Sequence, residues 1–191
     1  MKNFEFYLYF FLAISVISFS ACNDDDAGPE NDEEVITTLI YTLTPDDGTD
    51  PVVYSFQDVD GDGGNMPIVV GFMNRLKTGV TYTGTIELLN ESETPVEDIT
   101  AEIREEDEEH QFFFSFDGGA PNISLDYADQ DANGDPVGLA TTLTAIGASS
   151  GALMITLRHQ PNKGAAGVAQ GDIANAGGET DIEVNFFVTV E

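Results

Sequence analysis

Apolar and polar residues alternate along most of the chain after residue 34, with the period of two that is typical of half-buried β-strands. The pattern is clearest in residues 82–88 (YTGTIEL) and 182–190 (IEVNFFVTV), and in the second segment residues 182, 184, 186, 188 and 190 share one apolar face. Seven further segments are strand candidates: residues 35–44, 52–57, 68–73, 111–116, 123–127, 139–145 and 153–159. The sequence therefore predicts about nine strands.

Clusters of Gly, Asp, Asn and Pro separate these segments, for instance PDDGTD at residues 45–50 and DQDANGDP at residues 129–136. Such residues supply the positive φ angles and Asx turns that tight connections require. Many short strands with turns of this kind indicate an antiparallel sandwich or barrel. Because one sheet could not cover so many apolar faces, we expect a mostly β fold, an antiparallel β-sandwich of about nine strands with one short crossover helix.

The helix is expected after residue 94. Residues 94–97 (TPVE) fit a capping box with Pro at the first helical position. Val96, Ile99 and Ile103 then recur at helical spacing, which predicts a helix that runs through Glu109. The alternative is a strand over residues 99–103, since the acidic run that follows puts the wrong charge at a helix C-terminus.

Composition limits the classes of partner. The chain has 191 residues, 41% of them hydrophobic, which suffices for one ordinary domain with a packed core. There are 6 Lys and Arg against 35 Asp and Glu, and the formal net charge is −29. A field of this sign repels polyanions, so we expect no nucleic-acid binding and no electrostatic docking onto anionic lipid headgroups.

The first residues have the layout of a secretory signal. Residues 1–21 carry a Lys near the start, an apolar run and small residues, and the run is short for a membrane-spanning helix. The ending Phe19-Ser20-Ala21-Cys22 resembles the bacterial lipobox, although Phe19 stands where Leu is usual. That resemblance implies cleavage before Cys22 and acylation of its sulfur, so acyl chains would hold the protein at the membrane. The alternative is an incidental thiol in a leader.

Cys22 is the single Cys of the chain, so its acylation leaves no thiol for a disulfide, a zinc ligand or a nucleophile. The following Asn23-Asp24-Asp25-Asp26 resembles the acidic export signal of surface-exposed lipoproteins of Bacteroidetes-type bacteria, and a solvated spacer is the alternative. We therefore expect a signal peptide over residues 1–21, an acylated Cys with an acidic tether over 22–34, and a β-sandwich domain over 35–191. The expected location is the outer membrane, facing the periplasm or the cell surface.

Three stretches of the body, DVDGDGGN at residues 58–65, EHQFFF at 109–114 and AGGETDI at 176–182, resemble a group of small uncharacterised lipoproteins of Bacteroidetes-type bacteria. The resemblance covers most of the mature chain and implies no particular activity. Some members of the group carry the label of a type 1 periplasmic-binding fold. The pattern of this chain argues against that fold, because two lobes of alternating strands and helices need a longer, more helical chain.

Two Asp-rich loops are candidate calcium sites, because alternating oxygens followed by a Gly form the first half of a calcium loop. In both loops the second half departs from that pattern, since the twelfth position is Val69 in one and Ala140 in the other. Carboxylates from neighbouring loops could complete such a site, but Asp-Gly and Asn-Gly pairs are also ordinary hairpin residues. The residues assigned to calcium by this hypothesis are Asp58, Asp60, Asp62, Asp129, Asp131, Asn133 and Asp135.

His110 and His159 are the two histidines of the chain. A zinc site would pair them with an acidic residue such as Glu109 or Asp181, but they are 49 positions apart and neither lies in a short ligand motif. Hydrogen-bonded structural histidines are the favoured interpretation. Arg158 and Lys163 are among the few basic residues of the chain. We expect them to form structural ion pairs, and binding of a ligand carboxylate is the alternative.

The run Phe112-Phe113-Phe114 alternates across a strand, so we expect it to serve the core while Phe113 faces elsewhere. The loop over residues 160–180 is unusually long for a sandwich, and loops of this length often bind a ligand.

The sequence contains no hydrolase elbow, zincin, P-loop or dinucleotide-binding motif. Acidic pairs such as Glu105 and Glu106 are expected by chance in so acidic a chain. We therefore expect a non-enzymatic binding or structural module, whose partner could be a small molecule, a glycan or a protein. The alternative is a small envelope hydrolase or lyase that uses a carboxylate or a His.

Overall fold

The structure is a computed structural model and describes residues 34–61, 63–117 and 122–191. Cys22, the expected signal peptide and tether up to residue 33, and the calcium candidate Asp62 lie outside the described residues. Within the part that is described, no helix is both long and apolar enough to cross a bilayer.

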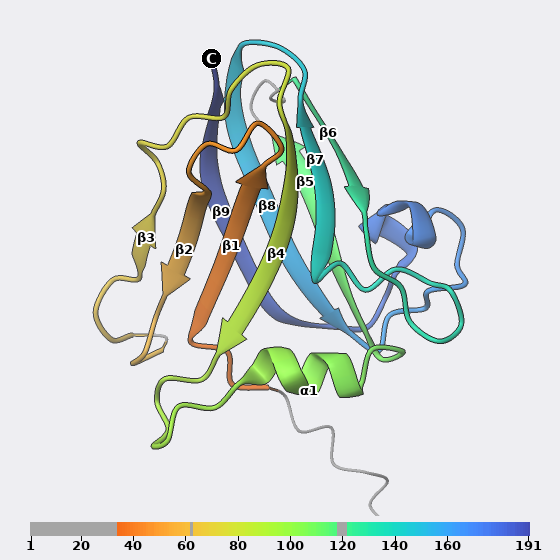
Figure 1. The fold of residues 1–191 in the computed structure, drawn as a ribbon. Coiled ribbons are helices and arrows are strands. Elements are labelled where there is room, and N and C mark those ends of the chain that lie inside the picture. The colour runs from red at the N-terminus through yellow and green to blue at the C-terminus, as the bar shows by residue number, and fades with distance from the viewer. Residues whose placement is uncertain (1–33, 62, 118–121) are drawn as a thin grey trace, which may run out of the picture. The chain divides into compact units, whose positions relative to one another are not determined.

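The described chain forms two antiparallel sheets that face each other, which confirms the predicted β-sandwich (Figure 1). The larger sheet has the strand order β3-β2-β1-β4-β7-β6 and the smaller has the order β5-β8-β9. The strands are β1 (Thr38–Pro45), β2 (Val52–Gln57), β3 (Ile68–Val70), β4 (Thr81–Leu89), β5 (His110–Asp117), β6 (Ile123–Tyr127), β7 (Ala140–Ala145), β8 (Ser149–His159) and β9 (Glu179–Val190). Each overlaps one of the nine segments predicted from alternation.

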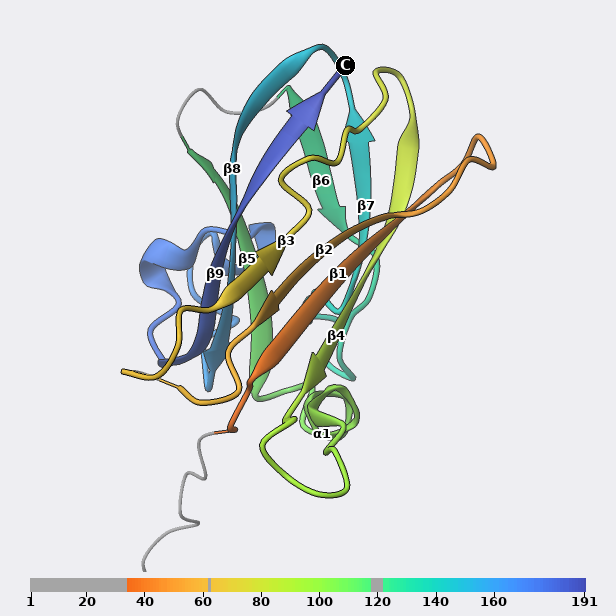
Figure 2. The ribbon, with the colours of Figure 1, turned by 90° about the vertical axis from the view of Figure 1, so that its left-hand side faces the viewer.

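The core lies between the two sheets, which stand on opposite sides of it when the molecule is seen from the edge (Figure 2). Every second residue of β4 and of the latter part of β9 is buried, as the alternation requires. Aromatic pairs join the layers: Tyr54 of β2 lies 5.6 Å from Phe186 of β9, and Tyr41 of β1 lies 6.1 Å from Phe114 of β5, between ring centroids. Each such aromatic pair stabilises the folded state by about 0.5–1.5 kcal/mol in addition to the effect of burying its apolar surface.

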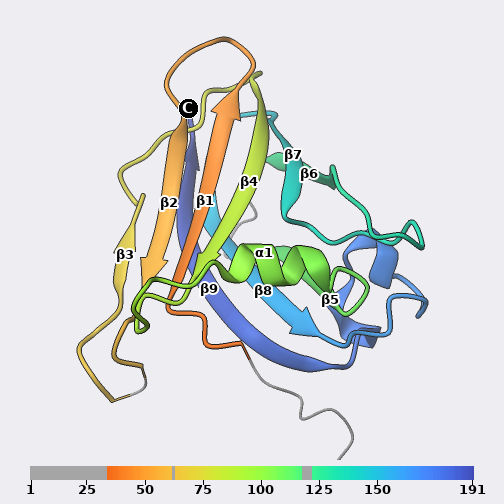
Figure 3. The ribbon, with the colours of Figure 1, turned by 60° about the horizontal axis from the view of Figure 1, so that its bottom comes forward.

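Helix α1 (Ile99–Glu105) connects β4 of the larger sheet to β5 of the smaller, so the predicted crossover helix is present. Its predicted start is wrong. The N-cap is Asp98, whose side chain accepts a hydrogen bond from the Ala101 N–H, and Thr94 lies before the helix. Its predicted end is also wrong, because the helix stops at Glu105, where further acidic residues would meet the negative end of the helix dipole. Figure 3 shows α1 lying across one end of the two sheets.

The long loop after β8 covers the outer face of the smaller sheet and contains two short 3-10 helices, η1 (Val168–Gln170) and η2 (Ile173–Asn175). Phe113 points to this side and is buried against Val168 and Ala176 in a second, smaller apolar cluster. Phe112 points the other way into the main core, so the predicted division of the Phe run is confirmed. The loop therefore packs as part of the fold.

Candidate metal centre

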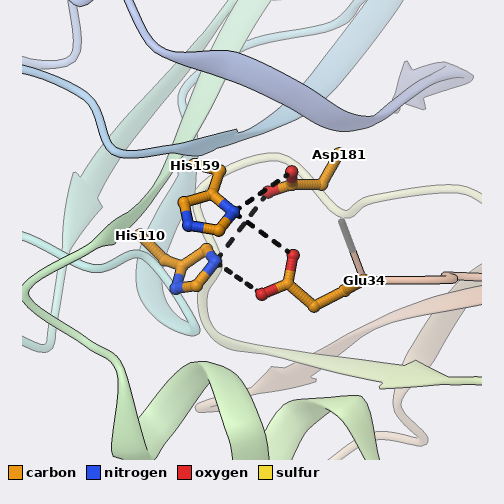
Figure 4. Close-up of side chains that lie close together, drawn as sticks. All are labelled: Glu34, His110, His159 and Asp181. Atoms are coloured by element: carbon orange, nitrogen blue, oxygen red, sulfur yellow. Dashed lines mark ion pairs between the residues drawn. The ribbon is translucent and has the colours of Figure 1, made fainter. Parts of the chain in front are cut away.

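Four side chains from distant parts of the sequence converge at the α1 end of the sandwich: Glu34, His110, His159 and Asp181 (Figure 4). Each offers one ligand atom, and these atoms all lie within 4.8 Å of one another. The side chains are almost completely buried, with exposed fractions of 7% for Glu34, 0% for His110, 7% for His159 and 1% for Asp181. Such a group of nitrogen and oxygen donors has the chemistry of a metal centre.

Strand pairing brings the two histidines together. His110 is the first residue of β5 and His159 is the last of β8, and the two are directly opposite in the antiparallel register. Their ring centroids are 4.6 Å apart. Both lie on the face that carries Phe112 and Leu157, because residues two apart on a strand point the same way. Both rings therefore point between the sheets.

A β-bulge directs Asp181 to the same place. In the β8–β9 register Leu157 pairs with Ile182 and Arg158 pairs with Thr180, so Asp181 is the extra residue of β9. In a regular strand Asp181 would point away from the core face that Ile182 occupies. A bulge re-aims a side chain in this way and is common beside functional sites. The bulge thus explains how an acidic residue next to a core isoleucine is buried beside the histidines.

Glu34 comes from the segment that leads into β1, and so from the side of the larger sheet. Its Oε1 lies 3.0 Å from His110 Nε2, and its Oε2 lies 3.6 Å from His159 Nδ1. Asp181 faces the same two nitrogens, with Oδ2 4.0 Å from His110 Nε2 and Oδ1 3.9 Å from His159 Nδ1. Each carboxylate therefore spans both imidazole rings, and the site joins the two layers of the sandwich.

The histidines have outer partners of the kind that orient metal ligands. His110 Nδ1 lies 3.0 Å from the Glu106 carbonyl oxygen, which can only accept a hydrogen bond. The proton of the neutral ring is therefore on Nδ1, and the lone pair of Nε2 points at the carboxylates. His159 Nε2 faces Glu109 Oε2 at 3.9 Å, on the side away from the site.

The carboxylate and imidazole charges of the site stabilise each other. Burial raises the pKa of the Glu34 carboxyl, but the hydrogen bond to His110, the hydrogen bond to its own backbone and the attraction of both imidazoles hold that pKa below its usual value. Burial lowers the pKa of His110, but Glu34 and the Glu106 carbonyl together raise it above its usual value. Among the described residues, the buried atoms Glu34 Oε2 and His159 Nδ1 make no hydrogen bond. A bound cation would satisfy these two atoms.

Three carboxylates of the two predicted calcium loops, those of Asp58, Asp60 and Asp129, accept hydrogen bonds from nearby residues. In the first loop, Asp58 accepts from the Gly61 N–H at 3.0 Å, and Asp60 accepts from the backbone and side chain of Asn65. In the second, both oxygens of Asp129 accept backbone N–H groups. Calcium at either loop stays a prediction, and it would have to compete with these bonds.

Asp131, the central residue of the second loop, is held by Lys163. Lys163 Nζ lies 2.8 Å from Asp131 Oδ2 and also donates to the Asp107 carbonyl oxygen at 2.6 Å. The remaining oxygen of Asp131 accepts the backbone N–H groups of Asn133 and Asp135. The structural ion pair predicted for Lys163 is thus confirmed, and both side chains are buried. Arg158 instead donates to the Gly178 carbonyl oxygen at 3.4 Å.

The sequence identified three of the four residues but not the site. The zinc hypothesis includes His110, His159 and Asp181, although structural histidines are the interpretation that the sequence favours. Glu109, the other acid of that hypothesis, lies behind His159. The predicted tether includes Glu34, whereas the side chain of Glu34 is buried against the two histidines. No local signal distinguishes Glu34 from the acidic residues before it. The only general cue was the long loop, whose two ends adjoin His159 and Asp181.

The fold and the site together define a two-sheet β protein with a buried histidine–carboxylate centre. Comparison of the chain with protein-family models, with curated proteins and with solved structures finds no match.

Proposed function

We propose that this protein is a lipid-anchored cell-envelope protein that binds a divalent transition-metal ion through Glu34, His110, His159 and Asp181. The observation that carries the proposal is the convergence of two imidazoles and two carboxylates within 4.8 Å in a buried position. Nitrogen donors favour zinc and similar ions over calcium and magnesium, which prefer oxygen.

The role of the protein is that of a non-enzymatic binding or structural module. A catalytic metal keeps one position open for water or substrate. Here the four side chains are at most 7% exposed, so a substrate has no direct path to the ion. The alternative, a small hydrolase or lyase, would require the site to open.

Anchoring is supported by the sequence before the described residues. The lipobox-like ending at Cys22 and the acidic run after it point to an outer-membrane lipoprotein that faces the periplasm or the cell surface. The resemblance of the body to small lipoproteins of Bacteroidetes-type bacteria supports the same location. The high negative charge also keeps the body away from anionic headgroups, so acyl chains are the expected attachment.

The Cys22→Ala variant tests the anchor. We expect the full-length wild type to fractionate with membranes and the variant to lose this association, because the acyl chains supply the membrane affinity. Mass spectrometry of the wild-type N-terminus should detect acylated Cys22. An unmodified Cys22 in membrane-associated wild type would contradict the anchor and leave the metal proposal untouched.

The metal proposal is tested by elemental analysis and titration calorimetry on the purified full-length protein. We expect one transition-metal ion per chain, and we expect His110→Ala and His159→Ala to lose it. The control is Glu87→Gln, which removes an exposed carboxylate of β4 and leaves the buried cluster intact. Wild-type protein that binds no zinc, cobalt, manganese, iron, nickel or copper at neutral pH would refute the proposal.

A further inference from the structure

The geometry points to zinc as the resident ion, and to a closed four-ligand site in which the ion cross-links the two sheets. This inference rests on the proposed function and extends it to the identity of the ion, its coordination and its structural effect. Glu34 is the decisive ligand, because it alone comes from the side of the larger sheet, whereas the other three come from β5, β8 and β9.

The distances suit a tetrahedral ion. With zinc–ligand bonds of about 2.0–2.1 Å, the ligand atoms of a tetrahedral site lie roughly 3.3 Å apart. The four nitrogen–oxygen distances across the cluster are 3.0, 3.6, 3.9 and 4.0 Å. These four distances involve both oxygens of each carboxylate, and with one ligand atom per residue the separations reach at most 4.8 Å. Binding of zinc therefore requires the widest pair of ligand atoms to approach by up to about 1.5 Å, which side-chain rotations of less than about 1 Å at each atom can supply.

Calcium and magnesium fit this place poorly. Calcium takes six to eight oxygen ligands, and magnesium keeps several of its waters. Two of the four donors here are imidazole nitrogens, and the burial of all four side chains leaves little room for a hydration shell. The two Asp-rich loops that are the calcium candidates lie elsewhere in the chain.

Charge balance also supports a divalent ion held by four protein ligands. Two carboxylates and two neutral imidazoles carry a charge of −2, which one Zn²⁺ neutralises. A buried centre without net charge avoids the large cost of placing unbalanced charge in a medium of low dielectric. The outer contact of His110 with the Glu106 carbonyl already holds the tautomer that a metal needs on Nε2.

The attachment of Glu34 to the body depends on its side chain. Further along the chain, the Thr37 N–H donates to the Leu89 carbonyl oxygen at 3.0 Å, and strand β1 begins at Thr38. Ile36 packs against the main core, and Glu34 precedes both Ile36 and this pairing. The Glu34 carboxylate therefore ties the start of the segment to the histidines of the smaller sheet. We expect zinc to order residues 34–36, which lead into β1.

Replacement of zinc by Co²⁺ in the full-length protein tests the coordination, since four-coordinate Co²⁺ absorbs visible light much more strongly than six-coordinate Co²⁺. We expect the intense four-coordinate spectrum in the wild type and in the control Glu87→Gln. In Glu34→Ala, the three remaining ligands should still bind, at least tenfold more weakly, and water should enter the fourth position. Added azide should then change the spectrum of Glu34→Ala and leave that of the wild type unchanged.

Hydrogen exchange of the same proteins tests the cross-link. We expect a chelator to lower the protection of the Thr37 amide, which pairs with Leu89 just after Glu34, in the wild type. We expect no such effect in Glu34→Ala or Glu34→Gln. If the wild type binds no transition metal, the proposed function fails and this inference fails with it. If the metal binds but Glu34→Ala keeps the wild-type affinity and spectrum, and a chelator leaves the protection of the Thr37 amide unchanged, the four-ligand site is refuted while metal binding stands.

Discussion

Removal of the metal by a strong chelator is expected to lower the thermal midpoint of the purified protein by about 10 °C. An ion that binds only the folded state stabilises it by about 4 kcal/mol when its free concentration is a thousand times its dissociation constant. For a chain of this size each kcal/mol moves the midpoint by roughly 2–4 °C. The measurement is differential scanning calorimetry with saturating zinc and with the chelator.

The histidine variants show whether this shift belongs to the proposed site. His110→Ala and His159→Ala should unfold at the same temperature with zinc and with chelator, because each lacks a ligand. Glu87→Gln should respond as the wild type does. A wild-type midpoint that does not change on chelation would contradict a structural role for the ion. The affinity should also fall in acid, because a proton on His110 competes with the metal for Nε2.

Replacement of Lys163 by Met is expected to destabilise the protein by about 3–5 kcal/mol, which is the usual effect of breaking a buried ion pair from one side. Lys163 and Asp131 have side-chain exposures of 6% and 1%, so the variant leaves a buried carboxylate without its cation. Chemical denaturation at neutral pH measures this loss of unfolding free energy.

The matched control is Lys77→Met. Lys77 pairs with Asp47 at 2.7 Å on the surface, and 63% of the lysine side chain is exposed. We expect the control to unfold close to the wild type, since exposed pairs contribute little.

The effect of the Lys163→Met variant should depend on pH with a definite sign. Burial raises the pKa of Asp131, but Lys163 and the backbone N–H groups of its turn lower it below the usual 3.8. A carboxylate with a lowered pKa contributes stability above its unfolded pKa and loses it as the pH falls through the folded value. The difference between wild type and variant should therefore be full at neutral pH and shrink below about pH 4. A difference that grows in acid, or an equal loss in Lys77→Met, would show that the pair is not the source.

The strands were accessible to sequence reasoning because their signal is local. Alternation in residues 182–190 requires only that one face of the strand is buried, and β9 shows this pattern of burial. The helix was harder. Thr94 and Asp98 are both good N-cap residues, and the choice between them depends on where Ile99 and Ile103 can reach the core.

The cluster of Glu34, His110, His159 and Asp181 was inaccessible for a related reason, because its side chains are brought into place by different non-local events. His110 meets His159 through the register of β5 and β8, and Asp181 joins them through a bulge in β9. Glu34 arrives through the packing of one sheet on the other. None of these events leaves a spacing that could be recognised along the chain.

Composition and alternation by themselves determined that this chain is acidic, mostly β and folded as two layers, since burial of apolar faces and turn chemistry act over a few residues. The lipid attachment at Cys22 is a separate prediction, which comes from the resemblance of residues 19–22 to the bacterial lipobox. Only the tertiary structure decided which of the many acidic residues stand beside the two histidines. Metal coordination depends on distances of a few ångströms between atoms, and in this protein strand register, one bulge and the contact between two sheets set those distances.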